Sequence, residues 1–427
     1  MSVVNWHLIE QLVTIPLFTG IIGYITNWTG ILMLFEPKRF YGVKVPGVAT
    51  LYPFLPRRVQ VIPAIRPDGR IGWQGIVPSR AEKMASIAVD KSLSKVGSIA
   101  QFYEVMDPEY ISEQLTRAAL PEIPSVVEGI MRRENPRLWY SLPEDIKLLV
   151  YRRVAASLPT DVRKITSTIG ENIDDYIDAK LMVIRYLSAN PKVLKDIFYN
   201  VGRKELLFMQ NFGFYFGYPM GFVLVGLLHF FPYWWLLPLG GIVIGYVVNY
   251  VGLTMIFEPL HSSKWVPWRQ GLFLKRRQEI AEQYATVMAD QVVTVENICD
   301  ELLHGPRSDR TRATVESVLR ESVDKASGWA RGVVKLSVGY DTYERVPQLA
   351  GAEAIKVAEQ TVSDPEFAAQ QQTKVRDFVV ARMSILRPED LSELLRSAIK
   401  QDEWLLFLHG AVLGSAAGFL HLAIFGV

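Results

Sequence analysis

The sequence contains a single cysteine, Cys299, among its 427 residues. One cysteine excludes an intramolecular disulfide and a cluster of thiolate metal ligands. The six histidines show no ligand spacing, and the chain has no glycine-rich phosphate loop and no nucleophile elbow. We therefore expect no catalytic residues, no metal site, no cofactor and no enzymatic activity.

Charge is also scarce, at 21% charged residues, and it is unevenly distributed. The formal net charge of +2 gives no case for a nucleic-acid partner. No Asp, Glu, Lys or Arg occurs in three windows of 25, 52 and 24 residues, which follow Glu10, Glu205 and Glu403. A helix needs about 20 predominantly apolar residues to cross a bilayer, so the outer windows each fit one crossing and the middle window fits two.

We predict four transmembrane helices, at residues 12–35, 212–231, 234–257 and 404–425. The middle pair is separated at Phe231-Pro232-Tyr233, because proline disrupts a continuous helix. Buried core helices of a large soluble protein are the alternative, and charge-free windows of this length argue against them. No basic residue precedes the first helix, its apolar run is long and no small-residue cleavage site follows it, so we do not expect a cleavable signal.

Basic residues collect beside the predicted helix ends, at Lys38 and Arg39, Arg203 and Lys204, and residues 275–277. The residues before the first helix, the hinge and the tail after the last helix contain no Lys or Arg. Basic residues near membrane ends tend to stay in the cytoplasm. With an even number of crossings, the polar segments 38–205 and 258–403 fall on one side, and we place both in the cytosol.

The chain repeats its motifs. Residues 22–37 read IGYITNWTGILMLFEP, and residues 244–259 read IGYVVNYVGLTMIFEP. Residues 73–85 and 269–281 share Gln-Gly followed by an arginine, and the closing helices share three glycines at a spacing of four. We predict two repeats, 1–231 and 232–427, each reading helix, cytosolic segment, helix. Two halves of parallel topology should be related by a pseudo-two-fold axis along the membrane normal.

In each half, an asparagine and two glycines lie on the same face of a predicted span, because residues three or four positions apart share a helix face. The two stripes are Gly23, Asn27 and Gly30, and Gly245, Asn249 and Gly252. Small residues let helices approach closely, and an amide can bond across the contact, either to the other asparagine or to carbonyls of a partner helix. The alternative is that the amides line a pathway for a polar solute or ion.

A second pair of motifs marks the point where the first and third helices leave the membrane. The residues are Glu36, Gln74, Gly75 and Arg80 in the first half, and Glu258, Gln270, Gly271 and Arg276 in the second. A glutamate at a helix C-terminus opposes the helix dipole, which invites a cationic partner. We expect the arginine of the same half to pair with the glutamate or with a lipid phosphate; a solvated carboxylate is the alternative.

The remaining polar sequence is mostly helical in pattern. Residues 41–78 are rich in Pro and Gly with short Val and Ile runs, which predicts short strands or an ordered loop near the headgroups. Proline-punctuated helices follow and lead into the second and fourth spans. The fold class is therefore an all-α membrane protein with four transmembrane helices in two pseudo-symmetric repeats, helical cytosolic segments and a small strand or loop insert.

The stretch GYITNWTGILMLFEP followed by WQGIVPSRAEKMA resembles bacterial membrane proteins of the YheB and YjiN type, grouped as domain of unknown function 445. LHGAVLGSAAGF, at residues 408–419, is similar to the last helix of that family. The resemblance implies a multi-pass protein of the bacterial cytoplasmic (inner) membrane and brings no established activity. Glu36 and Glu258 depart from the family pattern, which has a basic residue before the helix-ending proline.

Two functions remain open from the sequence. The first is a membrane-anchored scaffold or tether that presents helical cytosolic domains to a partner. The second is a transporter or lipid-handling protein with a pathway at the repeat interface. A tightly packed seam between the halves favours the scaffold, and a polar or lipid-sized cavity favours transport. The expected partners are the lipid bilayer, including anionic lipids, and a protein partner or a second copy of the chain.

Overall fold

A computed structural model describes residues 6–60, 62–327, 335 and 339–426. The chain forms two compact units, each built from separate stretches of sequence. We call Met1–Lys95, Ile184–Tyr284 and Met383–Val427 the span unit, and Val96–Val183 with Ala285–Arg382 the helical unit. Each unit takes stretches from both predicted repeats, so the compact units do not follow the boundary at residue 232, which stays a prediction.

The fold is all-α apart from two short strands, and short 3-10 or π turns are labelled η. The elements that begin in the span unit are α1 (Trp6–Phe35), β1 (Tyr41–Lys44), α2 (Val48–Leu51), η1 (Tyr52–Phe54), α3 (Arg57–Gln60), β2 (Arg70–Trp73), α4 (Ile76–Ser79), α5 (Ala81–Lys95), α13 (Pro191–Lys195), η3 (Asp196–Asn200), α14 (Arg203–Phe230), α15 (Leu236–Phe257), α16 (Leu272–Lys275), α17 (Arg277–Val287), α23 (Pro388–Lys400) and α24 (Glu403–Phe425). Those that begin in the helical unit are α6 (Ile99–Val105), α7 (Pro108–Ala119), η2 (Leu120–Glu122), α8 (Ile123–Glu134), α9 (Pro136–Ser141), α10 (Glu144–Glu171), α11 (Ile173–Tyr176), α12 (Ala179–Ala189), η4 (Met288–Val292), α18 (Val295–His304), α19 (Ser308–Ser327), α21 (Tyr340–Val362) and α22 (Pro365–Ser384).

Four helices are long and apolar enough to cross a membrane: Leu8–Phe35 within α1, α14, α15 and α24. They confirm the four predicted spans and the break between the middle two. The second begins earlier than predicted, at Arg203, because the helix continues through the charged residues that precede the apolar run. All four carry exposed large apolar side chains, including Val13, Val223, Val243 and Val412. Apolar surface of this extent on helices of this length is what a bilayer requires.

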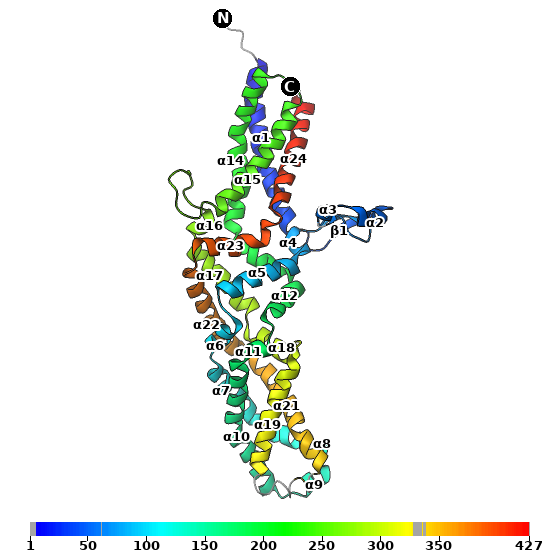
Figure 1. Cartoon of the computed structure of the whole chain (residues 1–427), viewed down its shortest axis with the longest axis vertical. Helices are drawn as coiled ribbons and strands as arrows, with labels where there is room; N and C mark the ends of the chain where they lie inside the picture. The colour runs from blue at the N-terminus through cyan, green and yellow to red at the C-terminus, as the bar shows by residue number, and fades with distance from the viewer. Residues whose placement is uncertain (1–5, 61, 328–334, 336–338, 427) are drawn as a thin grey trace. The chain divides into compact units, whose positions relative to one another are not determined.

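The four spans lie side by side (Figure 1). Helix α1 packs along α14, and α15 packs along α24; α1 also contacts α24, and α14 also contacts α15. At one end, Ile15, Leu224, Val225, Leu228 and Leu237 form a buried apolar cluster. The bundle is therefore two helix pairs joined face to face.

The Pro- and Gly-rich insert contains a two-stranded antiparallel sheet, with Tyr41 opposite Trp73 and Lys44 opposite Arg70. This agrees with the predicted strand or loop insert. In the helical unit, α10 packs against α7 and α19, and α19 packs against α21. Side chains that accept hydrogen bonds from the main chain begin several of these helices, as Ser98 does for α6 and Asp107 for α7. Such caps satisfy amide groups that helix starts leave free.

Candidate functional site

The glycines of the predicted stripes bring each helix pair into backbone contact. A Cβ atom on Gly23 of α1 would collide with the carbonyl oxygen of Gly213 of α14, and the reverse also holds. The same relationship joins Gly245 of α15 to Gly410 of α24. Only glycine permits so close an approach, so both contacts depend on the residue type.

The remaining glycines of the two stripes face the opposite helix pair. Gly30 of α1 lies against the side chains of Leu406 and His409 of α24. Gly252 of α15 lies against Met209 and Phe212 of α14, at ordinary contact distances or slightly closer. Each predicted stripe therefore serves two different contacts, one within a helix pair and one between the pairs.

Both asparagines are buried and bond to a partner helix. Nδ2 of Asn27 donates to the carbonyl oxygen of Met209 at 2.5 Å, and Nδ2 of Asn249 donates to that of Leu406 at 3.0 Å. Asn27 is 0% exposed, and Asn249 is 2% exposed. Of the predicted alternatives, the carbonyls of a partner helix are therefore the observed acceptors. The predicted bond between Asn27 of α1 and Asn249 of α15 is wrong, because the Nδ2 group of each asparagine donates to a carbonyl within its own helix pair.

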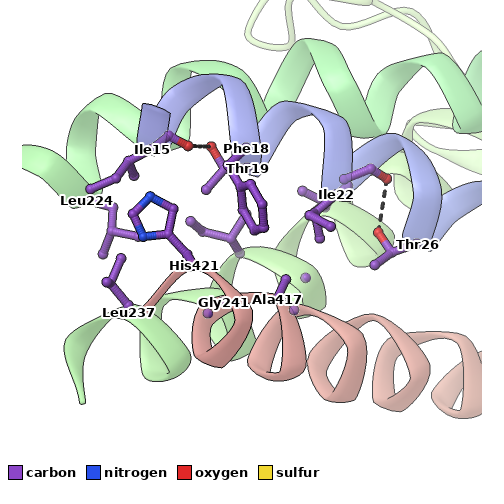
Figure 2. A pocket seen from close by; sticks show the side chains of 16 residues that line it. Ile15, Phe18, Thr19, Ile22, Thr26, Leu224, Leu237, Gly241, Ala417 and His421 are labelled. Carbon is purple, nitrogen blue, oxygen red and sulfur yellow. Dashed lines mark hydrogen bonds between the residues drawn. The ribbon is translucent and has the colours of Figure 1, made fainter. Parts of the chain in front are cut away.

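The four spans line a small apolar cavity of about 40 Å³ (Figure 2). Its lining comes from α1, α14, α15 and α24 and includes Thr19 and Thr26. Both hydroxyls already donate to carbonyls of their own helix, Thr19 to Ile15 and Thr26 to Gly23. A buried water molecule needs a cavity volume of roughly 10–15 Å³. The cavity therefore has room for about three waters and not for a lipid chain.

Sequence reasoning missed His421 of α24, whose ring points into this cavity (Figure 2). The residue is 4% exposed, and neither ring nitrogen has a hydrogen-bond partner in the described part of the chain. Its ring packs edge-on against Phe18 at 5.3 Å between centroids. It also lines a second void of about 10 Å³ beside Glu10, Gln11 and Thr14. The sequence carries a signal that His421 shares with His229 and His409, since an ionisable residue inside a membrane span is a candidate functional residue.

The Gln-Gly motifs hold the chain at the two membrane exits. The backbone nitrogen of Gly75 donates to the carbonyl oxygen of Pro37, and that of Gly271 donates to Pro259, both at 3.0 Å. Glu36-Pro37 and Glu258-Pro259 are both cis peptide bonds. A Cβ on either glycine would lie 2.7 Å from a backbone carbon at the end of the preceding span, which explains why glycine is needed at both positions.

The glutamines close the same turns from their side chains. Nε2 of Gln74 donates to the carbonyl oxygen of Lys38 at 3.0 Å. Nε2 of Gln270 donates to that of Leu260 at 2.9 Å. Each Gln-Gly pair therefore makes two hydrogen bonds to the chain after the glutamate. The glycine nitrogen donates to the proline carbonyl, and the glutamine side chain donates to the carbonyl of the residue that follows the proline. We call this arrangement the exit clasp, with Glu36 to Lys38 and Gln74-Gly75 in the first and Glu258 to Leu260 and Gln270-Gly271 in the second.

The charged partners of the clasps differ from those predicted. Glu36 pairs with Lys195 at 2.7 Å, and Glu258 pairs with Arg396 at 2.7 Å. Arg396 also bonds to Glu403, and these two carboxylates raise its pKa above the ordinary arginine value. The predicted pairing of each glutamate with the arginine of its own Gln-Gly motif is therefore wrong.

Arg80 and Arg276 instead reach the first turns of the closing spans. Arg80 pairs with Asp402, the residue that precedes α24. Nε of Arg276 lies 3.0 Å from Oε1 of Glu205, in the first turn of α14. Acidic residues are favoured at helix starts by the dipole, and they attract the arginines there. Each arginine therefore ties one half of the sequence to the other.

An all-helical bundle of four apolar spans with buried amides, a glycine-packed seam and charged clasps at the span ends defines an integral membrane protein. Similarity to known proteins agrees with this class. The chain is 30% identical to a UPF0754 membrane protein of Staphylococcus carnosus (strain TM300) over 89 residues, which are 20% of this chain and 23% of the relative. It is 32% identical to a UPF0754 membrane protein of Staphylococcus aureus (strain MRSA252) over the same length and coverage.

The match therefore spans about a quarter of the length of these relatives. Their printed name describes them as membrane proteins and states no activity. They carry a different family name from the one that the motifs predict. No family model matches the chain, and no solved structure matches it.

Proposed function

We propose that this protein is a membrane-anchored scaffold, in which a rigid four-helix anchor presents the helical unit to a partner. The observation that carries the proposal is the small volume, about 40 Å³, between the two helix pairs, each of which is held together internally by glycine-to-glycine backbone contacts. An anchor benefits from such packing, since close backbone approach is the main source of helix association in lipid.

We also propose that the two halves are repeats. Support comes from matched contacts at matched motif positions, such as Asn27 with Met209 and Asn249 with Leu406. The two exit clasps provide a second matched set, with the same backbone bond at 3.0 Å in each. The repeats would give the anchor its pseudo-two-fold arrangement.

The proposed location is the bacterial inner membrane, with both polar segments in the cytosol. The Lys and Arg residues beside the span ends support this orientation. It is tested with single cysteines, Ser141→Cys and Ser308→Cys, in a Cys299→Ser background. Both should react with a membrane-impermeant thiol reagent in inside-out vesicles and stay unreactive in intact cells. Reaction from opposite sides would overturn the four-span topology.

The scaffold and transporter hypotheses differ in whether water-soluble reagents can reach the space between the two helix pairs. Thr26, at 3% exposed, lines the cavity there. In the same Cys299→Ser background, Thr26→Cys should remain unlabelled by an impermeant thiol reagent from both sides of the membrane, with Ser308→Cys as the reactive control. Labelling of Thr26→Cys from either side would show an aqueous pathway and overturn the scaffold proposal.

Transport along the seam is the second candidate, and His421 favours it. An intramembrane ionisable side chain without a hydrogen-bond partner among the described residues is a candidate for proton or ion handling. Proton flux into vesicles containing the purified protein is the readout. Transport predicts a flux that His421→Phe abolishes and that His229→Phe preserves, because His229 of α14 is exposed. The scaffold predicts no protein-dependent flux in any of the three proteins.

A further inference from the structure

The helical unit contains an apolar cavity that none of the four spans contributes to. Its volume is about 170 Å³, and its lining comes from six helices: α6, α7, α10, α18, α19 and α21. These helices are labelled in Figure 1. Protein interiors are normally packed as densely as organic crystals, so a void of this size in a unit of this size calls for an occupant.

The apolar lining disfavours water and ions as that occupant. No Asp, Glu, Lys, Arg or His is among the described residues that line it. The hydroxyl of Tyr103 donates to the carbonyl oxygen of Thr166, and the hydroxyl of Thr166 donates to that of Val162. An apolar cavity of about 150 Å³ stays dry and takes up apolar molecules instead.

Part of the lining follows a single helix. Along α10 the lining runs through Leu158, Val162, Ile165, Thr166 and Ile169. At 1.5 Å per residue these positions extend about 16 Å along the helix. A cavity that is long and yet small in volume is narrow, which fits one extended alkyl chain better than a ring system or two chains side by side.

One polar group in the wall lacks a partner. Thr311 of α19 lines the cavity and is 3% exposed, and its Oγ1 makes no hydrogen bond to the described residues. A buried hydroxyl without a partner is unfavourable. A ligand with an oxygen at one end of an alkyl chain would satisfy it, because the hydroxyl can donate to the carbonyl oxygen of a protonated carboxyl group or of an ester.

We propose that this cavity binds a fatty-acyl chain, with the oxygen atoms of its carboxyl or ester end at Thr311. The chemistry shared by a free fatty acid and the acyl chain of a phospholipid is an alkyl chain ending in such oxygens. The bilayer around a protein with four membrane spans supplies both free fatty acids and phospholipids. The proposal uses no residue of the seam, so it stands or falls independently of the scaffold.

The test is photo-crosslinking of the full-length protein in lipid nanodiscs, with peptide mapping by mass spectrometry. One arm uses palmitic acid that carries a diazirine on its chain, and the other uses phosphatidylglycerol with the same group on one acyl chain. The proposal expects labelled peptides from α10 and α21 in at least one arm, displaced by excess unlabelled palmitic acid. Labelling in the first arm alone identifies the free acid, and labelling in the second identifies a lipid chain.

Variants make the result specific. Ala358→Phe fills the cavity from α21 and should reduce labelling at least tenfold, whereas Ala352→Phe on the exposed face of the same helix should leave it unchanged. Thr311→Val keeps the shape of the side chain and removes its hydroxyl, so it should weaken binding of palmitic acid several-fold even if Ala358→Phe fails to fold. Labelling that is absent from the cavity helices in both arms, or equal in wild type, Thr311→Val and a folded Ala358→Phe, would overturn the proposal.

Discussion

Gly23 of α1 and Gly213 of α14 face each other so closely that neither can carry a side chain. A Cβ on either residue would collide with the main-chain carbonyl of the other. A main chain held within two helices cannot move aside as a flexible side chain can. This pair, together with the close contacts of Gly217 and Gly221 with α1, sets the distance between α1 and α14, and a methyl group at Gly23 or Gly213 must push the helices apart.

The first prediction follows from this contact. Gly213→Ala should destabilise the protein by about 1–3 kcal/mol or more, as overpacked sites do. Gly226→Ala on the same helix is the matched control, because nothing lies within 4 Å of its added Cβ. It should be neutral or stabilising by up to ~1 kcal/mol, since alanine is the better helix former. Unfolding in detergent micelles measures both, and equal effects would contradict the backbone contact.

The second prediction concerns the buried amides. Asn27→Ala and Asn249→Ala each remove one interhelical hydrogen bond, which is worth about 0.6 kcal/mol on average in membrane helices and up to ~1.7 kcal/mol. Thr254→Ala is a control, because its hydroxyl bonds only to the carbonyl of Tyr250 in its own helix and is exposed. A structural role predicts lower stability for both asparagine variants in unfolding experiments. Unchanged stability with altered ion flux would support the pathway alternative.

The spans could be predicted from the sequence because the requirement is local. Absence of charge over the length of a bilayer crossing needs no knowledge of the partner, and the windows after Glu10, Glu205 and Glu403 met it. The need for glycine at Gly75 and Gly271 is not local, because an added Cβ would meet the end of the preceding span at Phe35 and Phe257. The acceptors of the two turns, Pro37 and Pro259, are likewise visible only in the structure.

The charged pairs could not be predicted, because the partners are far apart in sequence. Glu36 pairs with Lys195, and Arg80 pairs with Asp402. Neither Lys195 nor Asp402 lies in the motif segments of the first half, where the sequence predicts the partners. The cavity around Thr311 was invisible for the same reason, since it needs helices from two distant segments. His421 is different, because its residue type and its apolar neighbourhood are visible in the sequence, although the spacing of the histidines predicts no metal site.

The third prediction concerns the reactivity of Cys299. Burial, together with the negative charges of Glu359, Asp300 and Glu296, raises the pKa of its thiol to about 12. The thiolate is the reactive form, so alkylation at pH 8 should be about 10³-fold slower than for an unperturbed thiol with a pKa near 8.5. Mass spectrometry after iodoacetamide treatment measures the rate. Ser141→Cys, at an exposed position, should react quickly in the same sample, and unfolding should bring Cys299 to the same rate.

The fourth prediction is a dependence of stability on pH. Hydrogen bonds from Arg387 and Lys95 lower the pKa of Asp390 to about 2. In the unfolded chain the pKa is about 4, so this carboxylate stabilises the fold fully above about pH 4 and loses that effect as the pH falls toward 2. Asp390→Asn should lower the melting temperature at pH 7 and reduce the fall in melting temperature between pH 4 and pH 2.

The control for the pH experiment is Asp377→Asn, an exposed position in the middle of α22. It should leave both the melting temperature at pH 7 and the acid limb of the profile close to those of the wild type. If Asp390→Asn gave the same profile as Asp377→Asn, the hydrogen bonds of Asp390 would contribute nothing to stability.

The fifth prediction tests the crossed pairing of Arg276 with Glu205. Both side chains are largely buried, at 17% and 3% exposed, and Nε of Arg276 lies 3.0 Å from Oε1 of Glu205. Removing one partner of a buried pair costs roughly 3–5 kcal/mol, because the other charge loses its partner. Arg276 also lies 3.7 Å from Glu279, so Glu205→Gln should cost less than Arg276→Met. Arg276→Met and Glu205→Gln should therefore each destabilise the protein strongly, and the double variant should cost much less than the sum of the two.

A second cycle, Arg276→Met with Glu258→Gln, separates the observed pairing from the one expected along the sequence. Glu258 bonds to Arg396 and not to Arg276, so the two changes should add. Strong coupling in this second cycle, with additivity in the first, would reverse the assignment. Coupling confined to Arg276 and Glu205 would show that a charge from the second half of the chain binds the first half, because Arg276 follows the third span and Glu205 begins the second.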